Sequence, residues 1–171
     1  MASDVIKIAK AIDYNSVGTI EFLVDHEQNY YFIEMNTRIQ VEHPVTEMIT
    51  GIDLIEEQIK IAFDHELSFT QSDIQINGYA IECRINAEDP LNNFIPSVGT
   101  IENLVLPGGF GVRIDSMIYP NYSLSPFYDS MILKLIVHGK SRLECIHKMR
   151  RALEELIING VTTNNEFHYY M

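Results

Sequence analysis

Residues 34–42 read Glu34-Met35-Asn36-Thr37-Arg38-Ile39-Gln40-Val41-Glu42, with a charged or amide side chain at every second position. A period of two predicts an extended segment whose alternate side chains share one face. That face would carry two carboxylates, a guanidinium and two amides. Burying such groups beside apolar neighbours costs free energy unless something pairs with them. The stretch therefore predicts a surface that binds a charged ligand.

The preceding sequence predicts a hairpin that leads into this stretch. Residues 18–24 and 30–35 are rich in β-branched and aromatic side chains, and the polar residues 25–29 separate them. Symmetric closure would place Glu21 opposite Glu34. Two facing carboxylates repel each other, so this register needs a cation between them, or the true register differs. The sequence alone leaves both possibilities open.

The remaining sequence mixes helices and strands without a regular alternation. A first helix begins at Ser3 or Asp4, and a short helix over residues 44–50 is closed by Gly51. A capping box at Ser141 opens a helix with an apolar stripe formed by Leu143, Ile146, Met149, Leu153, Leu156 and Ile157. Further predicted elements are a helix from residue 53 to about 63 and strands over 76–86, 99–106, 111–116 and 131–137. We predict an α+β fold with a mainly antiparallel sheet and flanking helices.

Composition narrows the function classes. The chain has 171 residues, 46% of them hydrophobic and 21% charged, which is typical of one globular unit. A net charge of -12 argues against nucleic acid as a partner. Cys83 and Cys145 lack metal-ligand spacing and predict a reduced protein without disulfides. No apolar run approaches membrane-spanning length and the start lacks a signal sequence, so a cytoplasmic protein is expected.

A longer string points to a known family. The sequence Glu34-Met35-Asn36-Thr37-Arg38-Ile39-Gln40-Val41-Glu42-His43-Pro44-Val45-Thr46-Glu47 resembles the signature of biotin carboxylases, the ATP-grasp ligases that carboxylate biotin. Three further strings support this resemblance, so that it covers nearly the whole chain. They are Glu82-Cys83-Arg84-Ile85-Asn86-Ala87-Glu88, Pro107-Gly108-Gly109-Phe110-Gly111-Val112-Arg113 and Tyr128-Asp129-Ser130-Met131.

The resemblance also implies that the chain is a fragment, because family members are far longer. Residues 1–171 would form a single partial domain, comprising the C-terminal half of the ATP-grasp and the biotin carboxylase C-terminal domain. The N-terminal domain and the ATP lid would be absent, and the last helix would be cut at residues 169–171. We therefore expect half an active site and no activity from the isolated chain.

The resemblance assigns the nucleotide and its metal to the hairpin. Glu21 and Glu34, with Asn36, would hold the Mg2+ or Mn2+ ions that bridge the ATP phosphates, since hard cations prefer oxygen ligands. Such an ion would also remove the repulsion between the two facing carboxylates. Leu23, on the first strand of the hairpin, would contact adenine.

The resemblance assigns bicarbonate and biotin to other residues. Arg38, Gln40 and the backbone amide of Val41 would hold bicarbonate, because a guanidinium matches a planar oxyanion in two-point geometry. Glu42 would be the general base toward bicarbonate. Arg84 would stabilise the enolate-like oxygen of deprotonated biotin. Reaction through carboxyphosphate would release carbon dioxide beside that biotin.

The family also implies partners. Phe110 and Arg113 resemble positions at a homodimer interface of the full-length enzyme. Biotin would arrive on a biotin carboxyl carrier protein, and a carboxyltransferase would pass the carboxyl group on, as in acetyl-CoA carboxylase and fatty acid biosynthesis. The carboxyltransferase, and not this chain, would select the final carboxyl acceptor.

Simpler structural roles compete with these assignments. Glu21 alone is better explained as a solvated or salt-bridged strand residue. Arg84 could form a salt bridge with Glu82 or Glu88. His43 has no other histidine at metal-ligand spacing and is expected to be a packed or capping residue.

Two alternative functions remain. Another ATP-grasp ligase of the carbamoyl phosphate synthetase type has a similar Glu-x-Asn-x-Arg core, although residues 40–44 argue against it. A requirement of ATP hydrolysis for free biotin would separate the two enzymes. The chain could also be a non-catalytic binding or dimerisation fragment, for which its incompleteness is the main support.

Overall fold

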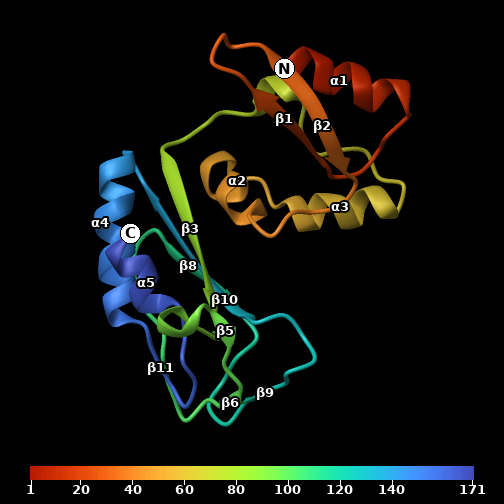
Figure 1. Ribbon diagram of the computed structural model, residues 1–171. Helices are drawn as coiled ribbons and strands as arrows, with labels where there is room; N and C mark the ends of the chain where they lie inside the picture. Colours follow the sequence, from red (N-terminus) through yellow and green to blue (C-terminus); the bar gives the residue numbers. More distant parts are fainter. The chain divides into compact units, whose positions relative to one another are not determined.

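The computed structural model describes residues 1–171, which form two compact units, Met1–Gln75 and Ile76–Met171 (Figure 1). We call them unit 1 and unit 2. Each has its own secondary structure and its own packing. The prediction that residues 1–171 form a single partial domain is not tested by this division and stays a prediction.

Unit 1 contains three α-helices, a hairpin and a short 3-10 helix. The elements are α1 (Ala2–Ala11), β1 (Thr19–Val24), β2 (Tyr30–Asn36), α2 (His43–Thr50), α3 (Leu54–Ala62) and η1 (Gln71–Asp73). The predicted hairpin is confirmed, and Asp25 holds its turn by accepting hydrogen bonds from the backbone of Glu27 and Asn29, both at 2.9 Å. Gly51 ends α2 with φ of 73°, a left-handed conformation that favours glycine.

The strand predicted for residues 34–42 is wrong beyond Asn36. The structure ends β2 at Asn36, bends at Arg38 and turns into α2 at His43. The backbone of His43 donates to the Gln40 carbonyl at 3.3 Å, and that of Val45 donates to the Glu42 carbonyl at 3.1 Å. These turn bonds replace a strand ladder, so the five polar side chains do not share one strand face.

A buried carboxylate stabilises the second half of unit 1. Glu57, on α3, is 7% exposed and accepts hydrogen bonds from Lys60 Nζ at 2.8 Å and from Ser68 Oγ and N at 2.6 and 3.1 Å. The bond from Lys60, followed by those from Ser68, lowers the pKa of Glu57 from 4.5 to about 2. The charged form is therefore the one that the fold prefers.

This carboxylate predicts an acid-dependent loss of stability. Since the folded pKa lies below the unfolded one, the contribution of Glu57 is complete above about pH 5 and disappears as pH falls toward 2. We expect Glu57→Gln to lower the melting temperature at pH 7 and to lower it progressively less below pH 5. Glu56→Gln is the control, because Glu56 also pairs with Lys60, at 2.8 Å, but is exposed. A constant difference between wild type and Glu57→Gln from pH 7 to pH 2 would contradict the assignment.

Unit 2 is built around an antiparallel sheet. Its main elements are β3 (Tyr79–Asn86), β8 (Val112–Ser116), β10 (Met131–Gly139), α4 (Arg142–Glu155) and α5 (Asn165–Tyr170). The smaller ones are β4 (Glu88–Asp89), η2 (Pro90–Asn92), β5 (Ile95–Pro96), β6 (Gly99–Thr100), β7 (Asn103–Val105), β9 (Ser123–Leu124) and β11 (Ile157–Asn159). The strand predicted over residues 99–106 is therefore split into β6 and β7, which pair with β9 and β11 respectively.

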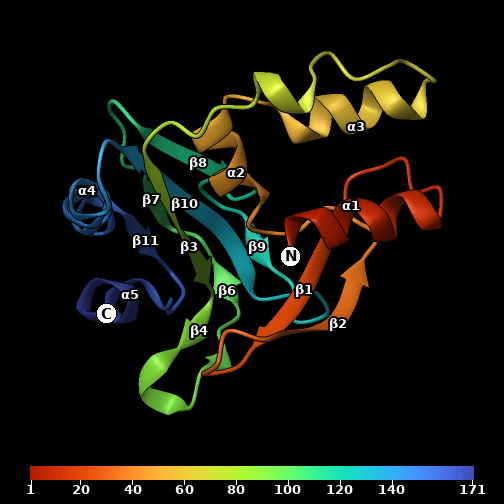
Figure 2. The same ribbon diagram turned by 90° about the horizontal axis from the view of Figure 1, so that it is seen from above.

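Strand β10 lies at the centre of the three-stranded sheet, in the order β3-β10-β8, and every strand pairing in the chain is antiparallel. This confirms the α+β fold with a mainly antiparallel sheet. Helix α4 packs on one face of the sheet, and α5 packs beside it against β3 (Figures 1 and 2). The core between them contains Ile85, Leu133, Leu135, Val137, Cys145, Met149, Ala152 and Leu153.

The apolar stripe predicted for α4 is partly wrong. Leu143 is 61% exposed, and Ile157 lies in β11 rather than in the helix. Cys145 and Ala152 are fully buried in their place. The capping hydrogen bond predicted for Ser141 is present, from Glu144 N to Ser141 Oγ at 3.2 Å. In a capping box the Glu144 side chain would also accept from the backbone N–H of Ser141. Here it accepts from the backbone N–H of Lys140 instead.

The two cysteines are free thiols, and both are at least partly buried. Burial, with a smaller contribution from the Glu82 charge, raises the pKa of Cys83 to about 11. This thiol is therefore protonated at neutral pH and a poor nucleophile. None of the helices combines the length and the apolar character needed to cross a membrane.

Candidate functional site

The hairpin of unit 1 brings two carboxylates face to face. Glu21 on β1 pairs with Glu34 on β2, and a register shift follows between Glu21 and Phe22. This is the register that symmetric closure predicted. The side-chain amide of Asn36 donates to Glu21 Oε1 at 3.0 Å and to Glu34 Oε1 at 3.1 Å. Both carboxylates are exposed to solvent, and the amide hydrogens supply the positive partner that two facing carboxylates require.

These three side chains fit a hard divalent cation. Rotation of the Asn36 amide would turn Oδ1 toward the space between the carboxylates and give three oxygen ligands on one surface. The chain has no cluster of three or more His, Cys, Asp or Glu side chains with metal-binding geometry. A cation at the hairpin would therefore take its remaining ligands from water or from phosphate oxygens, as is usual for Mg2+.

The segment after β2 carries a group of donors suited to an anion. Arg38 Nη1 donates to the Ile39 carbonyl at 3.0 Å and to Gln40 Oε1 at 3.1 Å. These bonds orient the guanidinium along the segment and fix the Gln40 amide. Gln40 Nε2 is buried and donates to no acceptor in the protein. A buried donor without an acceptor costs roughly 1–3 kcal/mol, so a ligand oxygen at this position would recover that free energy.

The start of α2 holds this segment in place. Glu42 occupies the N-cap position of α2, where its side chain makes no capping hydrogen bond, and is exposed. His43 Nδ1 lies 2.8 Å from the Gln40 carbonyl, and its Nε2 lies 3.9 Å from Glu47. Glu47 is 8% exposed and accepts from the backbone of Leu54 at 2.9 Å. His43 is thus a packed residue, as expected, and Glu47 is a buried anchor that the sequence did not single out.

Strand β3 of unit 2 carries Arg84. The side chain is exposed, and Arg84 lies opposite Lys134 of β10, which in turn lies opposite Asp115 of β8. Lys134 Nζ is 3.6 Å from Asp115 Oδ2, and Arg113 Nε donates to Asp115 Oδ1 at 2.8 Å. Partial burial opposes ionisation of Asp115, but the bonds and charges of Arg113 and Lys134 outweigh it and lower the pKa of Asp115. The face of the sheet that carries Arg84 therefore also carries Lys134 and Arg113, both paired with Asp115.

A second set of contacts holds the backbone beside Arg84. Asn164 Nδ2 donates to the Arg84 carbonyl at 3.1 Å, and His168 Nε2 lies 2.9 Å from the same oxygen. Neither Asn164 nor His168 was predicted to belong to a site, because both lie about 80 positions after Arg84 in the sequence. Asn164 belongs to the run Thr162-Thr163-Asn164-Asn165, whose composition indicates only a loop.

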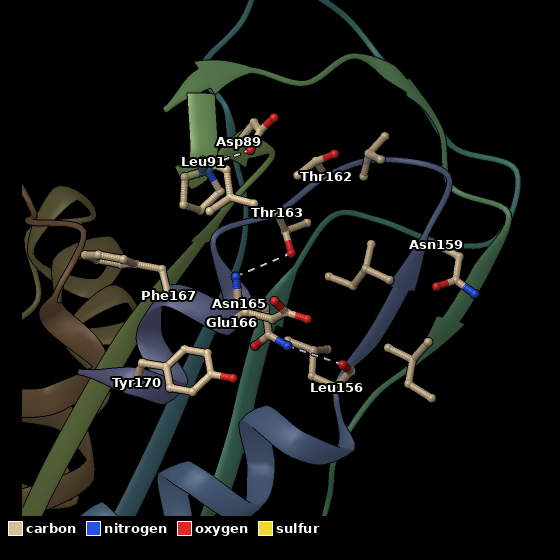
Figure 3. Close-up of a pocket in the computed structure, with 14 residues that line it drawn as sticks. Asp89, Leu91, Leu156, Asn159, Thr162, Thr163, Asn165, Glu166, Phe167 and Tyr170 are labelled. Carbon is tan, nitrogen blue, oxygen red and sulfur yellow. Dashed lines mark hydrogen bonds between the residues drawn. The ribbon is translucent and has the colours of Figure 1, made fainter. Parts of the chain in front are cut away.

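A cavity of about 550 Å³ lies elsewhere in unit 2, between β11, the following loop and α5 (Figure 3). Its lining includes Leu91, Leu156, Thr163, Phe167 and Tyr170, together with the carboxylates of Asp89 and Glu166. None of the predicted site residues lines it. The residues Phe110 and Arg113, which resemble interface positions, lie outside it as well.

Paired carboxylates on a hairpin, followed by an Arg-Gln pair, give unit 1 side chains suited to a hard cation and to a small anion. Residues 1–70 match the family "Carbamoyl-phosphate synthase L chain, ATP binding domain", and residues 82–171 match the family "Biotin carboxylase C-terminal domain". The chain belongs to the biotin carboxylase family.

Curated relatives agree with this assignment. Biotin carboxylase 1 of Bacillus subtilis is 58% identical over 169 residues, which are 98% of this chain and 38% of the relative. The biotin carboxylase of a Nostoc species is 54% identical over 168 residues, which are 98% of this chain and 38% of the relative. The chain thus spans little more than a third of the length of these curated relatives.

Solved structures show the same fold. The biotin carboxylase domain of a thermophilic 2-oxoglutarate carboxylase bound to bicarbonate has a TM-score of 0.95 and 53% identity, covering 98% of this chain and 38% of that chain. The biotin carboxylase domain dimer of the Hydrogenobacter thermophilus 2-oxoglutarate carboxylase, in complex with MgADP, ADP and bicarbonate, has a TM-score of 0.92 and 55% identity. The match covers 95% of this chain and 36% of that chain.

Proposed function

We propose that the chain contributes to the ATP-dependent carboxylation of biotin with bicarbonate, as part of a longer enzyme. In this proposal unit 1 is the C-terminal half of an ATP-grasp, and unit 2 is the biotin carboxylase C-terminal domain. The two family matches, over residues 1–70 and 82–171, support this division.

One observation carries the proposal. Gln40 places a buried amide donor without an acceptor next to a guanidinium that is bonded to the same side chain. Only Nη1 of Arg38 is used in these bonds, so Arg38 and Gln40 together can donate to more than one oxygen of a small planar anion. Bicarbonate has this shape and charge, and related carboxylase domains have been solved in complex with it.

Other residues of unit 1 would bind the metal, the adenine and the bicarbonate. Glu21, Glu34 and Asn36 would hold Mg2+ or Mn2+, which neutralises charge on the phosphates of ATP when bound. Leu23 is 60% exposed on β1 and would offer apolar contact to adenine. Val41 would donate its backbone N–H to bicarbonate. Glu42 would accept the bicarbonate proton, so that the anion can attack the γ-phosphorus of ATP, forming carboxyphosphate and releasing ADP.

Unit 2 would act on biotin through Arg84. Removing the ureido proton of biotin leaves negative charge on the ureido oxygen, and a fixed guanidinium stabilises that charge. Lys134 lies opposite Arg84 in the sheet and forms an ion pair with Asp115. Arg38, Glu42 and Arg84 are therefore the three proposed catalytic residues.

We further propose the family's partners for the full-length enzyme. They are a biotin carboxyl carrier protein, a carboxyltransferase and a second copy of the enzyme, as in acetyl-CoA carboxylase. The 94% exposure of Phe110 supports an interface there, and one of the related structures is a domain dimer. A cytoplasmic location is consistent with two free thiols.

The test uses a chimaera in which this chain replaces the matching segment of the Bacillus subtilis relative. We expect it to hydrolyse ATP in a reaction that requires both bicarbonate and free biotin. Gln40→Glu keeps the acceptor for Arg38 but replaces the buried donor by a negative oxygen. We expect the KM for bicarbonate to rise at least about tenfold, which is roughly 1.4 kcal/mol of binding free energy.

Gln71→Glu is the matched control, because it adds the same charge at an exposed position of unit 1. An unchanged KM for bicarbonate in Gln40→Glu would refute the anion site. ATP hydrolysis that needs bicarbonate but not biotin would favour a carbamoyl phosphate synthetase type of ligase. A folded chimaera without any activity would favour a binding or dimerisation fragment.

A further inference from the structure

The outer edge of β3 is held by a side chain instead of a neighbouring strand. β3 pairs with β10 on one side only and is an edge strand of its sheet. Its outward backbone groups at Arg84 and Asn86 need other partners when they are shielded from water. Asn164 supplies them.

Asn164 makes hydrogen bonds to the outer edge of β3 that a neighbouring strand would otherwise make. The backbone of Asn86 donates to Asn164 Oδ1 at 2.8 Å, and the backbone of Asn164 donates to the Asn86 carbonyl at 3.1 Å. Asn164 Nδ2 donates to the Arg84 carbonyl at 3.1 Å. Asn164 is 7% exposed, so water competes little for these three bonds.

His168 adds a fourth contact at the same place. Its Nε2 lies 2.9 Å from the Arg84 carbonyl, a geometry in which the ring donates through Nε2–H. The Arg84 carbonyl thus accepts from two side chains, one at the start of α5 and one within it. The arrangement fixes the backbone from which the Arg84 side chain projects.

The inner side of the same segment is also fixed. The backbone of Ala87 donates to the Ser130 carbonyl at 2.8 Å, and Glu88 accepts hydrogen bonds from Ser130 Oγ and Asn86 Nδ2. Residues 84–88 are therefore held from both edges. Contacts on both edges restrict the movement of the Arg84 Cα along and across the strand.

We propose that Asn164, assisted by His168, is a positioning residue for Arg84. This inference rests on the proposed role of Arg84 toward biotin. A guanidinium stabilises a developing charge only when it stays in place during the reaction, and a displacement of about 1 Å can cost on the order of 100-fold in rate. Asn164 does not act on biotin itself.

Asn165 is the matched control for this inference. It is the neighbouring residue of the same type, and its Nδ2 donates to the carbonyls of Leu153 and Leu156 at 3.0 and 3.4 Å, at the end of α4. Figure 3 shows the bond to Leu156. The Asn165 side chain is therefore bonded to the end of α4 and not to β3. Asn165→Ala should destabilise unit 2 without affecting the backbone around Arg84.

The first measurement is amide hydrogen exchange on the chain itself. Asn164→Ala removes the acceptor of the Asn86 amide, and we expect exchange at Asn86 to accelerate at least about tenfold relative to the amides of β10. Asn165→Ala should leave the ratio of these rates unchanged. Equal acceleration of exchange at Asn86 in both variants would show that Asn164 does not hold the edge of β3 specifically.

The second measurement is biotin-dependent turnover in the chimaera. We expect Asn164→Ala to lower kcat about tenfold with the KM values for ATP and bicarbonate unchanged, and Asn165→Ala to leave kcat unchanged. Asn164→Asp keeps the side-chain shape and the acceptor for Asn86 but loses the donor to Arg84, so it should also lower kcat. This variant remains informative if Asn164→Ala fails to fold.

A double-mutant cycle separates the two proposals. If Asn164 acts through Arg84, adding Asn164→Ala to Arg84→Met causes no further loss of kcat. Additive losses would overturn the positioning role. Full biotin-dependent turnover in Arg84→Met would refute the proposed role of Arg84 instead. Loss in Arg84→Met together with wild-type turnover in both Asn164 variants would refute the positioning inference alone.

Discussion

Replacing Glu42 by Gln in the chimaera should lower biotin-dependent turnover about 10²–10⁴-fold, which is the range for loss of a general base. Gln has nearly the same shape as Glu but cannot accept the proton of bicarbonate. The Glu42 side chain makes no capping hydrogen bond to α2, so the substitution removes no cap and the helix should form as before. Steady-state ATP hydrolysis with bicarbonate and biotin measures the effect.

The control for Glu42→Gln is Glu66→Gln, because Glu66 is an exposed carboxylate of the same unit. Its turnover should match that of the unsubstituted chimaera. Thermal unfolding of both variants checks that the fold is retained. If Glu42→Gln kept turnover within about threefold, Glu42 would not be the base, since a missing general base costs far more.

Replacing Arg84 by Met should lower the biotin-dependent kcat about 10²–10³-fold, the usual cost of removing one preorganised partner of a developing negative charge. Methionine keeps the apolar part of the side chain and removes only the charge and the donors. Arg84→Lys should recover part of the rate, because it restores the charge without the planar fork. Kinetics at saturating biotin separate the loss in kcat from a change in KM.

Arg142→Met tests whether any loss of positive charge from unit 2 has this effect. Arg142 is exposed in the first turn of α4 and belongs to the same unit. We expect it to change kcat less than about twofold, because α4 packs on the sheet face opposite to Arg84 and an exposed charge is screened by solvent. A comparable loss of kcat in Arg142→Met and Arg84→Met would show a general effect of net charge rather than a specific one.

Much of unit 1 could be predicted from sequence because its signals are local. β-branched and aromatic runs on both sides of Asp25 define the hairpin. Symmetric closure was one of two registers left open by the sequence, and the structure shows it, with Glu21 facing Glu34. Gly51 and Asp53 mark a helix end and a helix start, since one adopts positive φ and the other caps the backbone N–H of Glu56 at 2.8 Å. These features depend on residues only a few positions apart.

The conformation of residues 37–42 could not be predicted in the same way. The alternating pattern continues to Glu42, but Arg38 bonds to Ile39 and Gln40, and the turn bond from His43 to Gln40 starts α2. Side-chain bonds to nearby backbone competed successfully with a strand ladder. The residues of the proposed anion site lie together in this turn, in a geometry that the alternating pattern did not indicate.

The sequence by itself determined the hairpin, the end of α2, the start of α3 and the family to which the chain is similar, but it left the register of Glu21 and Glu34 open. Only the tertiary structure decided which face of α4 is buried and how Arg84 is held. Leu143 is exposed and Ala152 is buried because the sheet, and not helical periodicity, selects the packed face. Asn164 and His168 reach the Arg84 carbonyl only after the chain has folded back across about 80 residues. Such long-range contacts cannot be predicted from the neighbouring sequence, since Asn164 and His168 would have the same local sequence preferences in an exposed loop or helix.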